Sequence, residues 1–241
     1  MAAAPLGVAA RRGAAAASPF TASFHSATAA AVAATTVAGT TSATVTAVAN
    51  TARPNLLNAI GSFVFNVIGS AMLAFAGPPV LPRGSTVTVK VSSLTMPDTG
   101  ETVQANWYFP ENADSATRMI YFQHGFMAVA PMYSYTLAAL AQSTNSIVVA
   151  PTLSSNAFDP KAQWLGGSAD QQAVADLFAG DRSALTESAS AAVGHQVTLP
   201  ADFVLAGHSL GGALVTAAAG RMVGNGAIAN LRGVVLMDSV D

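Results

Sequence analysis

The sequence predicts a doubly wound α/β fold with a mostly parallel sheet, and three features predict it. From residue 84 onward, short apolar segments typical of strands alternate with segments typical of helices. SIVVAP, residues 146–151, has an all-apolar centre, which suits a parallel strand covered on both faces. GHSLG, residues 207–211, places a serine between an apolar strand and an alanine-rich helix. We expect right-handed crossovers to connect these elements.

The first two expected strands form a hairpin. STVTVKVSSLTMP, residues 85–97, alternates between polar and apolar side chains, and TVQANWYFP, residues 102–110, is a second strand of β-prone residues. Asp98, Thr99 and Gly100 lie between the two segments and have the composition of a tight turn.

Four further strands and four helices complete the expected domain, which we place at residues 83–241. The strands are expected at 118–125, 146–151, 202–209 and 231–239, because each is a short apolar run bounded by polar or turn residues. The helices are expected near 132–142, 169–179, 183–193 and 210–223.

Two different segments precede this domain. Residues 1–53 are rich in Ala, Thr, Ser and Val without a clean period, so we expect a disordered low-complexity tail. Arg11 and Arg12 beside an alanine-rich stretch weakly indicate an export or processing region, which favours a secreted or cell-envelope location over a cytoplasmic one.

Residues 54–82 form an apolar segment followed by a proline-rich connector. Residues 56–76 carry no charge and are long enough to cross a bilayer. A polar residue recurs there at every fourth position, at Asn58, Ser62, Asn66 and Ser70, which puts a polar stripe on one helical face. The stripe leaves three alternatives open: packing on the protein's own surface, peripheral contact with a membrane, or a true span.

The composition excludes several kinds of site. A net charge of −2 with only 9% charged residues gives no electrostatic basis for binding nucleic acid. Four histidines and no cysteine argue against a zinc cluster or a disulfide framework. No strand is followed by a Gly-x-Gly-x-x-Gly turn, so a dinucleotide site is excluded as well.

Ser209 is the candidate nucleophile because it fits the G-x-S-x-G pattern of a strand-to-helix elbow. The elbow is tight, and Gly207 and Gly211 are expected to avoid side-chain clashes between the strand and the helix. The serine hydroxyl is thereby exposed at the carboxyl edge of the sheet, beside the positive end of the helix.

FQHGFM, residues 122–127, is the candidate oxyanion loop. An oxyanion hole needs two backbone N–H groups that point at the developing negative charge. We expect one from Leu210, directly after the nucleophile, and the other from Phe126. Gly125 is expected to supply the unusual backbone angle that turns the N–H of Phe126 towards the site.

An acid is expected at the carboxyl edge of a later strand, where it would orient a histidine base. Asp238 ends the run GVVLMD and occupies such a position, and Asp241 is a nearby alternative. The competing interpretation is an aspartate that only caps a loop.

None of the four histidines is a good candidate for the base. His25 lies in the tail, and His208 points away from Ser209 because neighbouring strand residues face opposite sides. His195 precedes the nucleophile strand and lies about 23 Å away at roughly 3.3 Å per residue. His124 is at the correct edge, but as part of the oxyanion loop it is expected to be structural.

These motifs resemble those of the α/β hydrolases. Residues 54–241 are similar to mycobacterial α/β-hydrolase proteins, which carry a similar apolar segment with Asn and Phe before the domain. HGF, GHS and MDSVD also resemble the chlorophyllase and polyester-hydrolase branch, in which an acid lies in a segment like IDPVD. The resemblance implies an ester hydrolase without a cofactor, with Ser209 as nucleophile, Asp238 as acid, and Phe126 and Leu210 as oxyanion donors. Serine in place of the proline makes this sequence depart from the branch.

The α/β-hydrolase plan continues with two more strands and a histidine loop. We therefore expect a sheet that is incomplete at its C-terminal end, a catalytic histidine not present in this chain, and an inactive 241-residue fragment. The expected substrate is a small-molecule or lipid ester, and Phe126 and Trp164 are candidates for its apolar pocket. The alternative function is a non-catalytic, hydrolase-like binding or cell-envelope protein.

Overall fold

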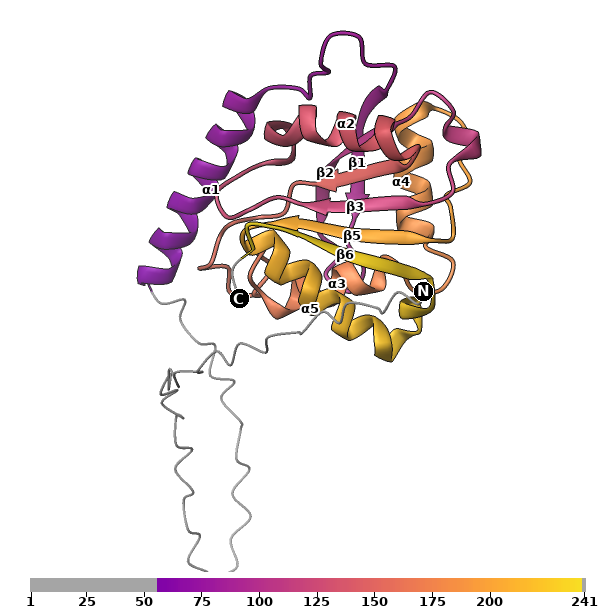
Figure 1. The fold of residues 1–241 in the computed structure, drawn as a ribbon. Helices are drawn as coiled ribbons and strands as arrows, with labels where there is room; N and C mark the ends of the chain where they lie inside the picture. Colours follow the sequence, from indigo (N-terminus) through magenta and orange to yellow (C-terminus); the bar gives the residue numbers. More distant parts are fainter. Residues whose placement is uncertain (1–55, 240–241) are drawn as a thin grey trace, which may run out of the picture. The chain divides into compact units, whose positions relative to one another are not determined.

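The computed structural model describes residues 56–239, and the two grey ends in Figure 1 are not described. The chain divides into two units, Met1–Asn50 and Thr51–Asp241, and the described residues all belong to the second. The expected tail at residues 1–53, His25 and Asp241 therefore lie outside the described part of the chain.

A six-stranded mixed sheet forms the centre of the described unit, in the order β1-β2-β4-β3-β5-β6 (Figure 1). Its strands are β1 (Thr88–Thr95), β2 (Thr102–Phe109), β3 (Met119–Gln123), β4 (Ile147–Pro151), β5 (Phe203–His208) and β6 (Leu231–Met237). The neighbouring strands β4, β3, β5 and β6 pair in parallel, whereas β2 runs antiparallel to both β1 and β4. The predicted fold class, an α/β fold with a doubly wound and mostly parallel sheet, is confirmed.

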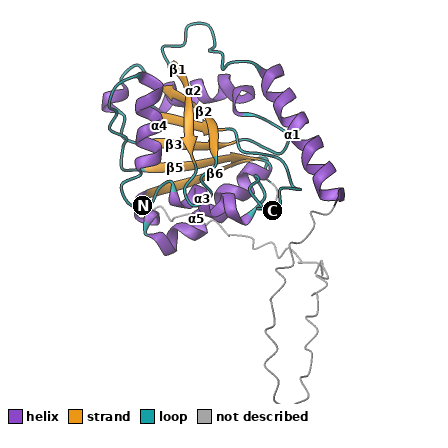
Figure 2. Ribbon diagram, turned by 180° about the vertical axis from the view of Figure 1, so that it is seen from behind, coloured by secondary structure: helices purple, strands orange, loops and turns teal. Residues whose placement is uncertain are grey.

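Helices cover both faces of this sheet (Figures 1 and 2). They are α1 (Leu56–Ala76), α2 (Ser134–Thr144), α3 (Ser168–Asp176), α4 (Ser183–Val193) and α5 (Leu210–Asn225), with short 3-10 turns at η1 (Ala113–Ser115), η2 (Ala130–Tyr133) and η3 (Ala227–Asn230). One apolar core lies under α2, and a larger one lies under α3, α4 and α5.

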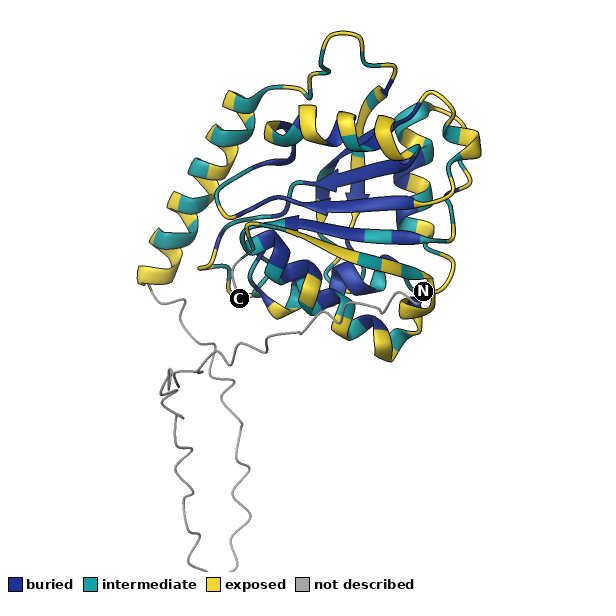
Figure 3. Cartoon of the chain, viewed as in Figure 1, coloured by how far each residue is buried: buried dark blue, intermediate teal, exposed yellow. Residues whose placement is uncertain are grey.

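The alternation of side chains along β3 explains why there are two cores. Every residue of β3 is buried, and the burial is deepest in the central strands (Figure 3). Tyr121 belongs to the larger core, whereas Ile120 and Phe122 belong to the core under α2. Because successive side chains of a strand point to opposite faces of the sheet, β3 contributes apolar side chains to both cores. Every residue of β4 is buried as well, as predicted from the all-apolar centre of residues 146–151.

Helix α1 packs on the protein through its polar stripe. The side-chain amide of Asn156 donates to Ser62 Oγ at 2.6 Å and to Asn66 Oδ1 at 3.2 Å. The Phe65 ring lies against Phe158, with the centroids 5.6 Å apart. By length and composition α1 is the one helix among residues 56–239 that could span a bilayer. Two residues of its polar stripe, Ser62 and Asn66, nevertheless contact the domain. No residue of α1 is fully buried.

Asp170, in the first turn of α3, is a buried carboxyl group whose two oxygens have no hydrogen-bond partner within the described residues. Burial and, to a smaller extent, the nearby carboxylates of Glu101 and Asp159 together raise its pKa to about 7. An aspartate that binds its proton more tightly in the folded state stabilises the fold at low pH. This stability is lost as the pH rises from the unfolded pKa near 3.8 to about 7.

We predict that Asp170→Asn removes this pH dependence. At about 1.36 kcal/mol per pKa unit, the wild-type free energy of unfolding should fall by up to about 4 kcal/mol between pH 4 and pH 8 through this group. Urea unfolding of both proteins across that range measures the difference. Equal slopes in the two proteins would show that Asp170 is ionised in the folded state.

Candidate active site

The turn between β5 and α5 holds Ser209 in a strained conformation. Its φ of 52° and ψ of −127° lie outside the regions that residues with a side chain ordinarily adopt. The Ser209 N–H donates to the carbonyl of Met237 at 3.0 Å, and the Ser209 carbonyl accepts from the Gly212 N–H at 2.8 Å. Backbone contacts on both sides therefore maintain a geometry that costs roughly 1–3 kcal/mol by itself.

The glycines of the elbow are required by close backbone contacts. A Cβ on Gly207 would meet the backbone of Gly211 and would lie 2.6 Å from the Gly212 nitrogen. A Cβ on Gly211 would collide with the carbonyl oxygens of Gln123 and His124. The N-terminus of α5 thus lies directly against the end of β3.

The loop after β3 is a tight turn, and the residue with the unusual backbone angle is Met127. The Ala128 N–H closes the turn on the Gly125 carbonyl at 3.1 Å, and Met127 at the third position has a φ of 59°. The expectation that Gly125 supplies this angle is therefore wrong. Gly125 is needed for space instead, because a Cβ there would lie 3.1 Å from Ser209 Cβ.

Two backbone N–H groups of this loop donate hydrogen bonds to side chains, and a third, between them, does not. The Gly125 N–H donates to the Tyr133 hydroxyl at 3.3 Å, and the Met127 N–H donates to Ser155 Oγ at 2.9 Å. Within residues 56–239 the Phe126 N–H has no acceptor. Leu210 is the first residue of α5, so its N–H has no acceptor within the helix. Neither expected donor is thus used by its own turn or helix.

Tyr133 connects the loop to the elbow. Its hydroxyl accepts from the Gly125 N–H and forms a 2.9 Å hydrogen bond with Nδ1 of His208. Its ring packs against Phe122, with the centroids 4.8 Å apart. Because the hydroxyl contacts both segments, it links the His124–Gly125 peptide to His208, the neighbour of Ser209. The sequence pattern did not reveal this role, since Tyr133 is distant from both partners along the chain.

His124 is a structural residue with both ring nitrogens engaged. Nε2 accepts from the Leu153 N–H at 3.1 Å, which leaves the proton on Nδ1, from where it is donated to the Gly125 carbonyl at 2.8 Å. Burial disfavours the charged imidazolium and lowers the pKa of His124 to about 4. The neutral ring therefore joins the end of β3 to the loop after β4.

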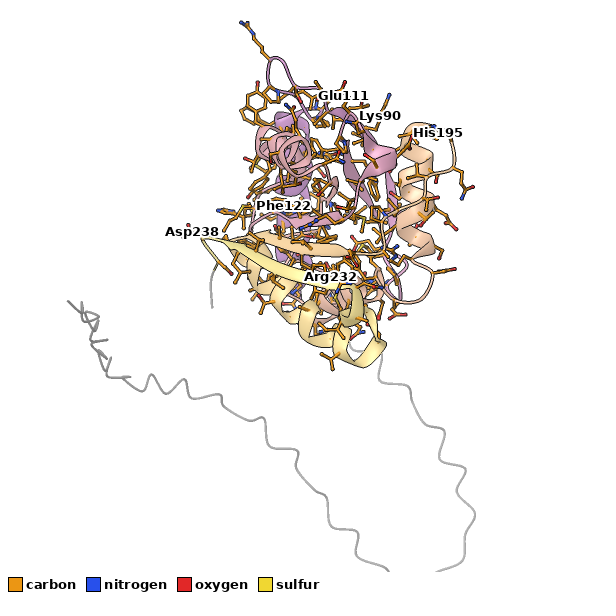
Figure 4. All side chains as sticks on the ribbon, turned by 45° about the vertical axis from the view of Figure 1, so that its right-hand side comes forward. Lys90, Glu111, Phe122, His195, Arg232 and Asp238 are labelled. Atoms are coloured by element: carbon orange, nitrogen blue, oxygen red, sulfur yellow. The ribbon has the colours of Figure 1, made fainter. Side chains whose placement is uncertain are left out.

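The other described histidines do not contact the Ser209 hydroxyl either. His195 lies beside Thr88, Phe109 and Ile147, and Ile147 starts β4, so His195 is at the opposite edge of the sheet from Ser209. Figure 4 shows His195 and Asp238 at opposite ends of the sheet. His208 uses Nδ1 to bind Tyr133. Among residues 56–239, no histidine is hydrogen-bonded to the nucleophile's side chain.

Asp238 directly follows β6 and lies next to the elbow. Its neighbour Met237 accepts the Ser209 N–H, and Asp238 itself is exposed with a φ of 46°. Ser239 follows with a 3.5 Å hydrogen bond from its hydroxyl to the Ser209 carbonyl. The structure thus brings Ser209, Leu210, the Phe126 loop and Asp238 to one edge of the sheet.

An aromatic group flanks the loop on its outer side. The Phe126 ring lies 6.0 Å from that of Phe65 on α1 and 6.5 Å from that of Trp164. Trp164 also packs against the larger core, so it serves both regions. No three His, Asp or Glu side chains of the described chain gather in a metal-binding arrangement.

Comparison with known proteins gives structural likeness only. No family model matches the sequence, and no curated protein matches it. Similar solved structures include DphMB1 (20% identity, TM-score 0.46, 70% of this chain and 50% of that one). The thermophilic carboxylesterase EstE1 from a metagenomic library is another, with 16% identity and a TM-score of 0.45. The match covers 78% of this chain and 56% of EstE1. Brefeldin A esterase, described as a bacterial homologue of human hormone-sensitive lipase, is a third, with 13% identity and a TM-score of 0.48. The match covers 76% of this chain and 48% of that esterase. The chain spans about half the length of these structures.

Proposed function

We propose that this protein is a serine hydrolase of carboxylic esters, with Ser209 as its nucleophile. The observation that carries the proposal is the strained Ser209 at the sheet edge, packed against a loop whose Phe126 N–H has no acceptor among residues 56–239. Strain of this kind concentrates at functional sites. Preorganised N–H donors beside a serine nucleophile are the arrangement that stabilises an oxyanion.

In the proposed reaction, Ser209 Oγ forms a bond to the ester carbonyl carbon while a base takes its proton. The carbonyl oxygen becomes an oxyanion, which the N–H groups of Phe126 and Leu210 stabilise. The carbon–oxygen bond to the alcohol then breaks, and the alcohol leaves with the proton. Water hydrolyses the resulting acyl-enzyme by the same steps and releases the acid.

The proposed acid is Asp238, and the proposed base is a histidine outside residues 56–239. The described histidines support this assignment, because His124 and His208 are engaged elsewhere and His195 lies at the other edge. Asp238 would hold such a histidine from the end of β6.

We predict that the protein isolated from its native source hydrolyses p-nitrophenyl butyrate. Ser209→Ala should lower kcat/KM by about 10³-fold or more, because the acyl-enzyme can no longer form. Ser143→Ala, at an exposed position on α2, serves as the control and should leave hydrolysis unchanged. If Ser209→Ala hydrolyses the ester as well as wild type, Ser209 is not the nucleophile. If wild type does not hydrolyse the ester, the alternative of a non-catalytic binding protein takes over.

Phe126→Pro tests the oxyanion donor. Proline suits the second position of this turn but has no N–H, so turnover should fall by about 10²-fold or more. Phe126→Ala removes the same ring and keeps the N–H, and it should retain most of the turnover number. Equal values of kcat for the two folded variants would exclude the Phe126 N–H as a donor.

We also propose that α1 contacts a lipid surface peripherally. Several of its large apolar side chains face outward, and Phe63 and Phe75 are 69% and 89% exposed. Asn156 is hydrogen-bonded to Ser62 and Asn66 of the polar stripe, so the opposite, apolar face of α1 is the one that can contact a lipid surface. An uncharged helix with this division suits a membrane interface.

Co-sedimentation with neutral phosphatidylcholine vesicles tests this contact. The double variant Phe63→Glu, Phe75→Glu should reduce the bound fraction severalfold, because charged side chains disfavour the interface. Val223→Glu changes an exposed apolar residue on α5 and should bind like wild type. Equal binding by all three proteins would contradict the proposal.

A further inference from the structure

A groove lies between α1 and the loops at the carboxyl edge of β4. It has a volume of about 430 Å³ and is lined by Phe65, Gly69 and Leu73 of α1 on one side. Val103, Met127 and Leu153 contribute apolar side chains from the body of the domain. The volume lies within the range of small-molecule sites.

The groove begins beside the proposed oxyanion donor. Met127, which lines it, is the residue directly after Phe126. The sheet order places β3 between β4 and β5, so the groove over β4 lies two strand spacings from the strand that carries Ser209. At about 4.8 Å per spacing, this separation is about 10 Å. An extended chain advances roughly 1.2 Å per backbone atom, so a linear substituent needs about eight atoms to reach the groove.

The charge of the lining favours an uncharged occupant. Glu101 lines the groove, and burial followed by the charge of Asp159 raises its pKa. No lysine or arginine of the described chain lines the groove. An anionic group would thus meet a carboxyl group and no cation, whereas a neutral chain buries apolar surface against both walls.

We propose that this groove binds the linear, uncharged acyl chain of a long-chain ester. The proposal rests on the function proposed for Ser209 and names the substrate class of that site. An acetyl or butyryl group is too short to reach the groove, whereas a decanoyl group enters it. Gly69 keeps the α1 wall open, because a Cβ at this position has no heavy atom within 4 Å.

Gly69→Leu fills the groove and tests the proposal in the native protein. The ratio of kcat/KM for p-nitrophenyl decanoate to that for p-nitrophenyl acetate should fall at least about tenfold, because buried methylene groups lose their contacts. Gly220→Leu is the matched control. Gly220 also lies in a helix with open space around its Cβ, on α5, so this variant should keep the wild-type ratio. An unchanged ratio in Gly69→Leu would overturn the groove as the acyl site.

A binding measurement separates this proposal from the function on which it rests. In a Ser209→Ala background, methyl decanoate should bind more tightly than decanoate anion, and Gly69→Leu should weaken its binding at least about tenfold. This result supports the groove even if hydrolysis by wild type does not depend on Ser209. Equal affinity of the Gly69→Leu and Gly220→Leu proteins for methyl decanoate overturns the groove even if the hydrolase function holds.

Discussion

The close contact between the start of α5 and the end of β3 is the constraint on which the candidate site depends. Gly211 lies so close to the carbonyl oxygens of Gln123 and His124 that no side chain fits between them. This contact brings the first N–H groups of the helix to the same place as the loop that follows β3. Gly125 repeats the arrangement against Ser209. Two backbone segments can therefore present N–H groups to one small volume without any charged side chain.

Much of the fold follows from local sequence patterns, because burial has a regular period in strands and helices. The strand at residues 146–151 and the elbow at Ser209 were predictable, since each is specified by a contiguous run of residues. The contacts of Tyr133 and Asn156 were not predictable, because each depends on partners distant in sequence. The positive φ was assigned to Gly125, whereas Met127 carries it. The hydrogen bonds around the turn set that angle, and the residue type alone does not.

Within residues 56–239, the loops around the site are held together by hydrogen bonds of neutral polar side chains and not by ion pairs. His124 is held uncharged by burial and joins two loops through ordinary hydrogen bonds. Tyr133 and Ser155 engage the N–H groups on either side of Phe126. In a chain with only 9% charged residues, this arrangement avoids the desolvation cost of burying further ions beside the site. It also leaves the oxyanion as the principal charge that would develop there.

The shallow seating of α1 has a consequence for the way the protein moves. A helix without a fully buried residue adds little to the cooperative core, so it forms its own unit of local stability. Neither apolar core contains a residue of α1, so undocking of the helix from Asn156 would leave both cores in place. If the groove binds an acyl chain as proposed, the bound chain would favour the docked helix, because undocking removes one wall of the groove. The affinity for that chain would then include the free-energy cost of ordering α1.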